Sequence, residues 1–153
     1  MRIAVGSDER SVLTDAIVKW LNEHEYEVSL HGPLADKQQA WPVVARQVAE
    51  TVTRGEVDEG ILLCWTGTGV SIAANKVPGI RAALCDDAET ARGARLWNDA
   101  NLLCLSLRRL SNVMALEILE TWFETSYQPN TEDDACLEAV KQIEGDYTRS
   151  NDG

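Results

Sequence analysis

Short apolar runs alternate along the chain with segments whose apolar residues recur every three or four positions. The apolar runs predict buried strands over 2–7, 27–32, 57–67, 80–85 and 101–106. The periodic segments predict helices over 11–24, 41–55, 69–77, 88–98, 112–126 and 132–147. Because such alternation is typical of a parallel sheet covered on both faces, we expect an α/β fold. In this fold a three-layer, doubly wound (Rossmann-like) five-stranded parallel sheet carries a C-terminal helix.

No repeat, low-complexity segment or linker divides the chain. Its 153 residues suit one domain with a substantial core. We expect that domain to span 1–147, followed by a frayed tail over 148–153. Ser11 is placed to cap the first helix, Pro42 stands in the first turn of the second, and Gly55 is a stop signal after it.

The formal net charge of -11 argues against a nucleic-acid or anionic-membrane partner, since both need a basic face. No apolar run approaches the ~20 residues of a membrane span, and the first residues indicate a strand rather than a signal peptide. We therefore expect a cytoplasmic protein. The four cysteines and two histidines show neither a CxxC pair nor metal-ligand spacing, so the sequence predicts no metal, no cofactor and no disulfide framework.

Polar clusters follow three of the expected strands, over 6–9, 64–69 and 85–87. Ligands of open parallel sheets bind beyond the carboxyl ends of the strands, so these clusters predict a site at that edge. Cys64 stands just before a short helix, whose start stabilises a thiolate that can act as a general base. The alternative is that Cys64 is a small core residue.

A glycine-rich run follows this cysteine. Glycines at a helix start let backbone N–H groups point into a cavity and hold an oxyanion, such as the enediolate of a sugar isomerisation. The residues concerned are Gly67, Thr68, Gly69, Val70 and Ser71. The alternative is an ordinary strand-to-helix turn. Two alternatives also stay open for Asp8, which binds sugar hydroxyls or caps the next helix, whereas Asn98 suits a helix end.

Residues 64–76, CWTGTGVSIAANK, followed by GIRAALC over 79–85, resemble the ribose-5-phosphate isomerase B family. That family includes the galactose-6-phosphate isomerase subunits. The resemblance covers residues 1–127 and includes GSDE over 6–9 and WNDANLL over 97–103. It implies the doubly wound fold and an assembly of dimers or tetramers whose active sites are shared between subunits.

The resemblance also implies roles for individual residues. Cys64 matches the base that moves a proton between the first two sugar carbons, and Thr66 matches a threonine that assists ring opening. The backbone of 67–71 matches the segment that holds the enediolate. Asp8 and Asn98 match residues that contact the sugar.

The chain departs from the family at several positions that face the sugar or lie near it. The replacements are Glu9 for a histidine, Trp65 for a glycine, Ala40 and Trp41 for an Asp-Tyr pair, and Trp97 for the ring-opening histidine. The arginines that clamp the phosphate have no match over 128–137, which holds three acids and no base. Because acids repel a phosphate dianion, we expect a changed substrate.

Two functions follow from this pattern. The first is an aldose–ketose isomerase that works through an enediolate on an altered sugar or sugar phosphate, as a homodimer or tetramer. The second is a non-catalytic relative that serves as the partner subunit of a heteromer or binds a sugar.

Overall fold

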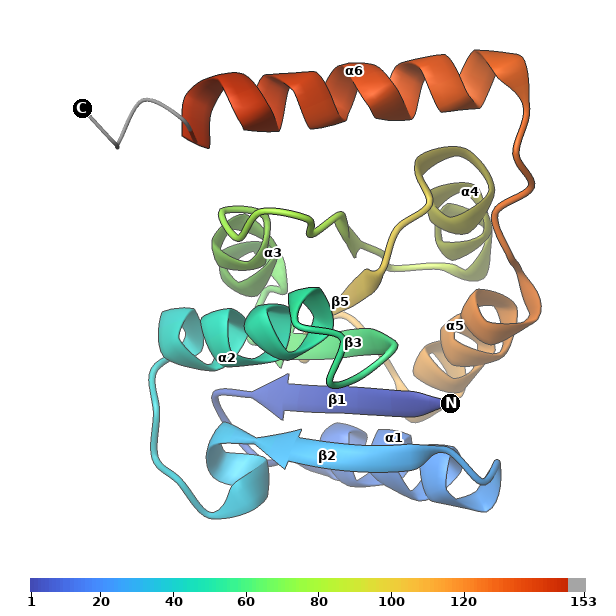
Figure 1. The fold of residues 1–153 in the computed structure, drawn as a ribbon. Coiled ribbons are helices and arrows are strands. Elements are labelled where there is room, and N and C mark those ends of the chain that lie inside the picture. Colours follow the sequence, from blue (N-terminus) through green and yellow to red (C-terminus); the bar gives the residue numbers. More distant parts are fainter. Residues whose placement is uncertain (149–153) are drawn as a thin grey trace.

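The computed structural model describes residues 1–148, and five parallel strands form one sheet in the order β2-β1-β3-β5-β4 (Figure 1). The strands are β1 (Arg2–Ser7), β2 (Glu27–His31), β3 (Glu59–Cys64), β4 (Ala82–Leu84) and β5 (Leu102–Ser106). The predicted doubly wound sheet is therefore confirmed. The tail predicted over 148–153 lies, apart from Thr148, outside the described residues.

Helices cover both faces of the sheet. They are α1 (Val12–Glu23), α2 (Trp41–Thr53), α3 (Thr68–Ala74), α4 (Ala88–Asn98), α5 (Asn112–Glu124) and α6 (Thr131–Thr148), with a short 3-10 helix η1 (Gly32–Ala35). On one face, Ile3, Ile61 and Leu103 pack against α1, α4 and α5. On the other, Leu62 and Cys104 pack against α2 and α3. Alternate residues of each strand thus enter two separate cores.

The local signals predicted for the first helices are confirmed. The Ser11 hydroxyl accepts a hydrogen bond from the Thr14 backbone N–H (3.2 Å), and the Thr14 hydroxyl accepts one from the Ser11 N–H (2.9 Å). These two bonds form a capping box at the start of α1. Pro42 lies in the first turn of α2, and Gly55, with φ of 70°, follows the end of that helix.

Four strands are shorter than predicted, β2 and β5 by one residue each, and η1 was not predicted. β3 ends at Cys64 instead of continuing to Gly67, because Gly67 adopts a φ of 76°, which a strand does not accommodate. β4 begins at Ala82, two residues later than predicted. After β2, Gly32 adopts a φ of 68° and turns the chain into η1.

Two asparagine side chains hold the short edge strand β4. The Asn75 amide donates to the Ala82 carbonyl (3.0 Å) and accepts from the Ala82 N–H (2.8 Å). The Asn101 amide accepts from the Arg81 N–H (2.8 Å) and donates to the Gly79 carbonyl (2.9 Å). The Asn75 side chain therefore satisfies backbone groups of Ala82 that no sixth strand pairs with, and Asn101 links residues 79–81 to the start of β5.

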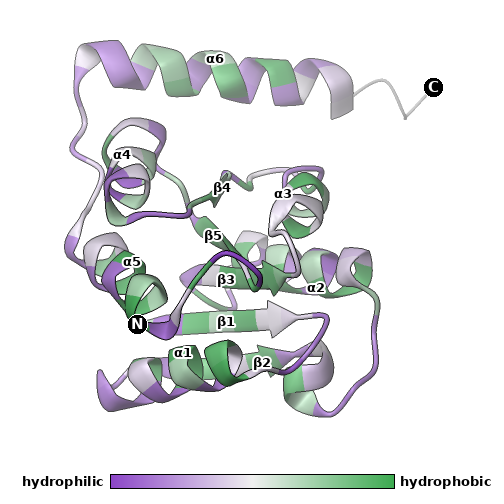
Figure 2. Cartoon of the chain, turned by 180° about the vertical axis from the view of Figure 1, so that it is seen from behind, coloured by the Kyte–Doolittle hydropathy of each residue, from purple (hydrophilic) through white to green (hydrophobic). Residues whose placement is uncertain are grey.

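Helix α6 stands apart from the sheet (Figure 1) and buries none of its described residues. Polar contacts hold it to the body: the Tyr127 hydroxyl donates to Asp134 (2.6 Å), and Glu144 accepts from the Gly79 N–H (2.9 Å). Figure 2 shows apolar stretches along this helix even so. Across residues 1–148, no helix is long and apolar enough to cross a membrane.

A buried ionic cluster joins β3, α4 and α5. Glu59 accepts from Arg95 and from the Trp122 indole N–H, both at 2.6 Å. The Arg95 guanidinium also donates to the carbonyls of Thr125 and Ala100 and lies 4.8 Å from the centre of the Trp122 ring. Burial raises the pKa of Glu59, and Arg95 opposes that rise.

Candidate active site

The order of the strands places the candidate site. β1 and β3 are central neighbours, and the chain leaves them in opposite directions, toward β2 and toward β5. In doubly wound sheets such a switch point opens a crevice beyond the carboxyl ends of the strands. Ser7 pairs with Leu63, so Asp8 and Cys64 follow side by side at this edge.

The Cys64 side chain points to the face that α2 and α3 cover. It is 5% exposed and belongs to the core on that side. Cys64 is therefore a nearly buried thiol at the carboxyl end of β3, directly before the turn that leads to α3. This position is compatible with both alternatives for Cys64, a general base and a small core residue.

The turn after Cys64 requires its glycine. A Cβ on Gly67 would lie 2.6 Å from Leu84 Cδ1 and 3.0 Å from the Leu105 carbonyl oxygen, and the φ of 76° favours glycine as well. The carbonyl of Trp65 accepts from the Ser106 hydroxyl and from the Arg108 N–H, both at 3.0 Å. The turn is thus fixed by β5, while the Trp65 side chain is 60% exposed.

The first turn of α3 faces the crevice with its backbone. The N–H groups at a helix start have no partners within the helix, so those of Thr68, Gly69 and Val70 are available to an anion. The Ser71 N–H already bonds to the Gly67 carbonyl at 3.3 Å. Val70 is buried in the core, which leaves only its backbone for this role.

Two hydroxyl groups lie beside this turn. The oxygens of Thr66 and Thr68 are 2.8 Å apart, and both side chains are exposed. A hydroxyl pair at the mouth of the crevice can pass a proton to or from a bound oxygen atom. This position agrees with the ring-opening role that the resemblance implies for Thr66, which stays a prediction.

Trp41 lies over the glycine run. Its ring carbons are 3.1–3.3 Å from the position that a Cβ on Gly69 would occupy, so a side chain at Gly69 would require the indole to move by a few tenths of an ångström. Trp41 nevertheless keeps 40% of its surface exposed. Trp65, in the same segment as Gly69, is also largely exposed, so both rings keep apolar surface that a ligand could contact.

Asp8 does not cap the next helix, because Ser11 does so. Its carboxyl oxygen Oδ1 is buried and has no hydrogen-bond partner among residues 1–148. Burial raises the pKa of Asp8, and its own backbone N–H partly offsets the rise. The capping alternative for Asp8 is therefore excluded, and its contact with a sugar stays a prediction.

The third polar cluster serves the fold. Asp87 caps α4 by accepting from the Thr90 N–H at 2.6 Å, and Asp86 pairs with Arg109 at 3.3 Å. Burial raises the pKa of the Cys85 thiol to about 12, so this thiol stays protonated. The prediction that residues 85–87 belong to the site is therefore not supported by their geometry.

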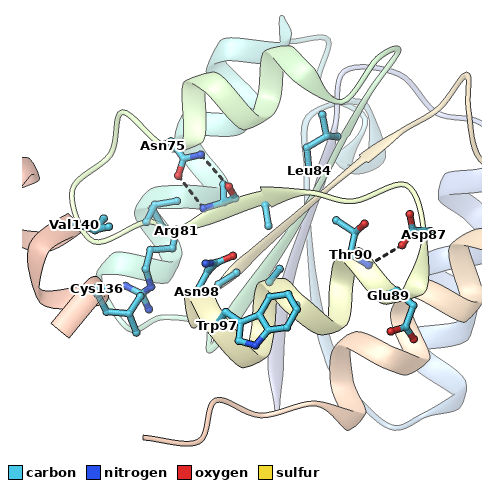
Figure 3. A pocket seen from close by; sticks show the side chains of 17 residues that line it. Asn75, Arg81, Leu84, Asp87, Glu89, Thr90, Trp97, Asn98, Cys136 and Val140 are labelled. Atoms are coloured by element: carbon cyan, nitrogen blue, oxygen red, sulfur yellow. Dashed lines mark hydrogen bonds between the residues drawn. The ribbon is translucent and has the colours of Figure 1, made fainter. Parts of the chain in front are cut away.

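Asn98 lies at the other end of the molecule from Cys64. α4 begins after β4, at the carboxyl edge, and runs back to end three residues before Asn101, at the opposite edge. There Trp97 and Asn98 line a separate hollow of about 930 Å³ between β4, α4 and α6 (Figure 3). Within one chain, Asn98 does not reach the crevice.

Trp97 shows how open this hollow is. Its ring lies against Gly93, where a Cβ would approach ring carbons to 2.7 Å, and the side chain is 63% exposed. Trp97 therefore stays largely exposed within a single chain. Among residues 1–148, no group of His, Cys, Asp or Glu side chains is arranged to hold a metal.

The sheet order and the glycine turn define a doubly wound α/β protein. Residues 3–140 match the model of the Ribose/Galactose Isomerase family, and the chain belongs to this family, whose members include sugar-phosphate isomerases.

Individual relatives match over nearly the whole chain. Ribose-5-phosphate isomerase B of Escherichia coli is 38% identical over 94% of this chain and 96% of its own. A 4-deoxy-4-sulfo-D-erythrose isomerase of a Clostridium species is 32% identical over 95% and 94%. The structure of ribose-5-phosphate isomerase B from Clostridium thermocellum matches with a TM-score of 0.89 at 39% identity, covering 96% and 99% of the two chains.

Proposed function

We propose that this protein is an aldose–ketose isomerase that works through an enediolate. The carrying observation is the common position of Cys64, Asp8 and the first turn of α3 at the switch point of the sheet. Cys64 removes a proton from the carbon next to the carbonyl group and returns it to the neighbouring carbon. The backbone N–H groups of residues 68–70 hold the negative charge that develops on oxygen, and Thr66 assists ring opening.

We also propose that the substrate differs from that of ribose-5-phosphate isomerase B. Glu9 follows Asp8 after β1, so two acids stand at this carboxyl end, and acids disfavour a phosphate. Trp41 covers the glycine run and Trp65 projects from the turn. These features favour a sugar that stacks on aromatic rings and carries no phosphate at this end.

A panel of sugars tests both statements. We expect deuterium from heavy water to enter the carbon next to the carbonyl of free aldoses faster than that of ribose 5-phosphate. Nuclear magnetic resonance of the sugar measures this exchange directly. Absence of exchange with every sugar would favour the non-catalytic partner subunit, to which the exposed Trp97 in place of a histidine also points. Rapid turnover of ribose 5-phosphate would contradict the changed substrate.

A second copy of the chain is proposed to cover α6 and to bring Asn98 to a neighbouring crevice. Val140 and Ile143 are 51% and 60% exposed on this helix, and Val140 lines the hollow that contains Asn98. Val140 and Ile143 are three residues apart on a helix that buries none of its described residues, and such an unburied apolar stripe favours burial against a partner. A homodimer is the simplest assembly that provides this.

Replacing both Val140 and Ile143 with glutamate is expected to convert the assembly to a monomer of 16.9 kDa, because two charges would enter its apolar contact. Light scattering coupled to size-exclusion chromatography measures the mass. The matched control is Gln142→Glu, which adds a charge on the same helix at an exposed polar position. If the double variant keeps the mass of the wild-type assembly, α6 does not form the contact between subunits.

A further inference from the structure

Three buried polar atoms lack a hydrogen-bond partner among residues 1–148: Asp8 Oδ1, His31 Nε2 and Gln39 Oε1. Buried polar atoms of native proteins are nearly always paired, so each such atom needs an explanation. Asp8 directly follows β1, His31 ends β2 and Gln39 lies two residues before α2. All three therefore lie at the carboxyl edge of the sheet.

Strand register places His31 on the same side of the sheet as Cys64. His31 pairs with Gly6, and a Cβ on Gly6 would lie 2.6 Å from Val44 and 2.9 Å from Val48 of α2. Side chains of paired residues point to the same face, and so do residues two apart. His31 and Gly6 thus face α2, as Cys64 does.

The start of α2 brings Gln39 to the same place. Val44 lies one turn into α2 and would meet a Cβ on Gly6 at 2.6 Å and one on Gly32 at 2.7 Å. The first turn of this helix therefore covers the ends of β1 and β2. Gln39 immediately precedes Ala40, the N-cap of α2, so it lies next to this covered corner, and its Oε1 is buried.

The spacing of the strands suits a sugar chain. Cys64, Asp8 and His31 end three adjacent strands, β3, β1 and β2. Neighbouring strands are about 4.8 Å apart, so the row spans roughly 10 Å. An open-chain pentose or hexose that reacts at Cys64 would extend along this row.

The chemistry of the three atoms selects the ligand. A carboxylate oxygen and an amide oxygen only accept hydrogen bonds. Burial and the nearby Lys37 lower the pKa of His31, so its ring is neutral and its Nε2 also accepts or donates a single hydrogen bond. A hydroxyl group donates and accepts, and it satisfies each of these atoms. A phosphate dianion has only acceptors to offer and would meet a carboxylate.

We propose that Asp8, His31 and Gln39 form a subsite for the hydroxyl groups of the sugar carbons remote from Cys64. The inference rests on the proposed function for the identity of the reacting end. The substrate class is therefore a polyhydroxylated sugar whose end remote from Cys64 carries no charge. His31 and Gln39 are specificity-determining residues that touch no reacting atom.

Binding of ribitol, an unreactive polyol, tests the subsite without catalysis. In calorimetric titrations, His31→Phe and Gln39→Met are each expected to weaken ribitol binding about tenfold, the effect of one lost hydrogen bond. Gln38→Met is the matched control, because Gln38 is exposed and adjacent. Both test variants should unfold at or above the temperature of the wild type, since each removes an unpaired buried polar atom. His31→Asn provides a milder second variant.

Steady-state kinetics provide a second test of the subsite. With free ribose, the two test variants should raise KM and leave kcat nearly unchanged. With glyceraldehyde, which is too short to reach the subsite, both constants should match those of the wild type. A ribitol affinity that the variants leave unchanged, an equal loss with glyceraldehyde, or wild-type protein that binds inorganic phosphate instead of ribitol would each overturn the subsite.

The two proposals fail separately. If ribitol binding depends on His31 and Gln39 but no sugar is turned over, the subsite stands and the isomerase proposal falls. If sugars are isomerised through Cys64 with both variants unaffected, the isomerase stands and the subsite falls.

Discussion

Cys64→Ala is expected to slow proton exchange at the sugar carbon by about 10²–10⁴-fold, the usual contribution of a general base. Cys64 is the thiol at the carboxyl end of β3, and alanine offers no atom that accepts a proton. Cys64→Ser should be nearly as slow, because a serine hydroxyl is a far weaker base near neutral pH. Deuterium incorporation from heavy water, followed by nuclear magnetic resonance, measures the rate.

The matched control is Cys136→Ser, which changes an exposed thiol on α6. Its exchange rate should equal that of the wild type. Ribitol binding by Cys64→Ala protein shows that the crevice remains intact. If Cys64→Ala protein exchanges protons at the rate of the wild type, Cys64 is a core residue and another group is the base.

Arg95→Ala is expected to lower the free energy of unfolding by about 3–5 kcal/mol, because it leaves Glu59 buried without its cation. The two side chains are only 12% and 10% exposed, and 2.6 Å separates their charged atoms. Such a loss is a large part of the ~5–15 kcal/mol that stabilises a domain. Urea unfolding followed by tryptophan fluorescence measures it.

The loss should depend on pH. Burial raises the pKa of Glu59 in the folded protein above that in the unfolded chain. A carboxyl group of this kind contributes stability that is complete below the unfolded pKa and declines as pH rises through the folded pKa. Removing Arg95 raises the folded pKa further, so the deficit of the variant should grow from pH 5 to pH 8.

Arg92→Ala is the matched control for this cluster, because Arg92 pairs with Glu89 on the surface of the same helix. Exposed pairs contribute ~0–1 kcal/mol, so its effect should be small at every pH. Equal losses for Arg92→Ala and Arg95→Ala would show that the buried pair contributes no more to the free energy of unfolding than the exposed pair.

Much of the fold was predictable because its signals are local. Ser11, Pro42 and Gly55 act through neighbouring residues, and helix periodicity depends only on sequence spacing. The end of β3 was harder, since the Trp65 carbonyl bonds to Ser106 and the Gly67 position is restricted by Leu84. Those contacts join segments far apart in the chain, and apolar patterning does not encode them.

The candidate site likewise contains some residues that local sequence identifies and others that only the fold identifies. Cys64 and the glycine run form one continuous stretch, so the sequence was enough to select them. His31 and Gln39 gain their significance only from the order of the strands and the position of α2 over their ends. For Asn98 the sequence resemblance was not sufficient. It implies a contact with the sugar, yet within one chain Asn98 lies at the edge of the sheet opposite Cys64.

The two hydrogen bonds between the Asn75 side chain and Ala82 affect how copies of this chain can associate. An edge strand with free backbone groups invites another strand to pair with it, which leads to extended sheets and aggregation. Asn75 occupies both outward groups of Ala82, so the β4 edge offers little to a second sheet. Pairing with a strand of another chain is therefore disfavoured at this residue.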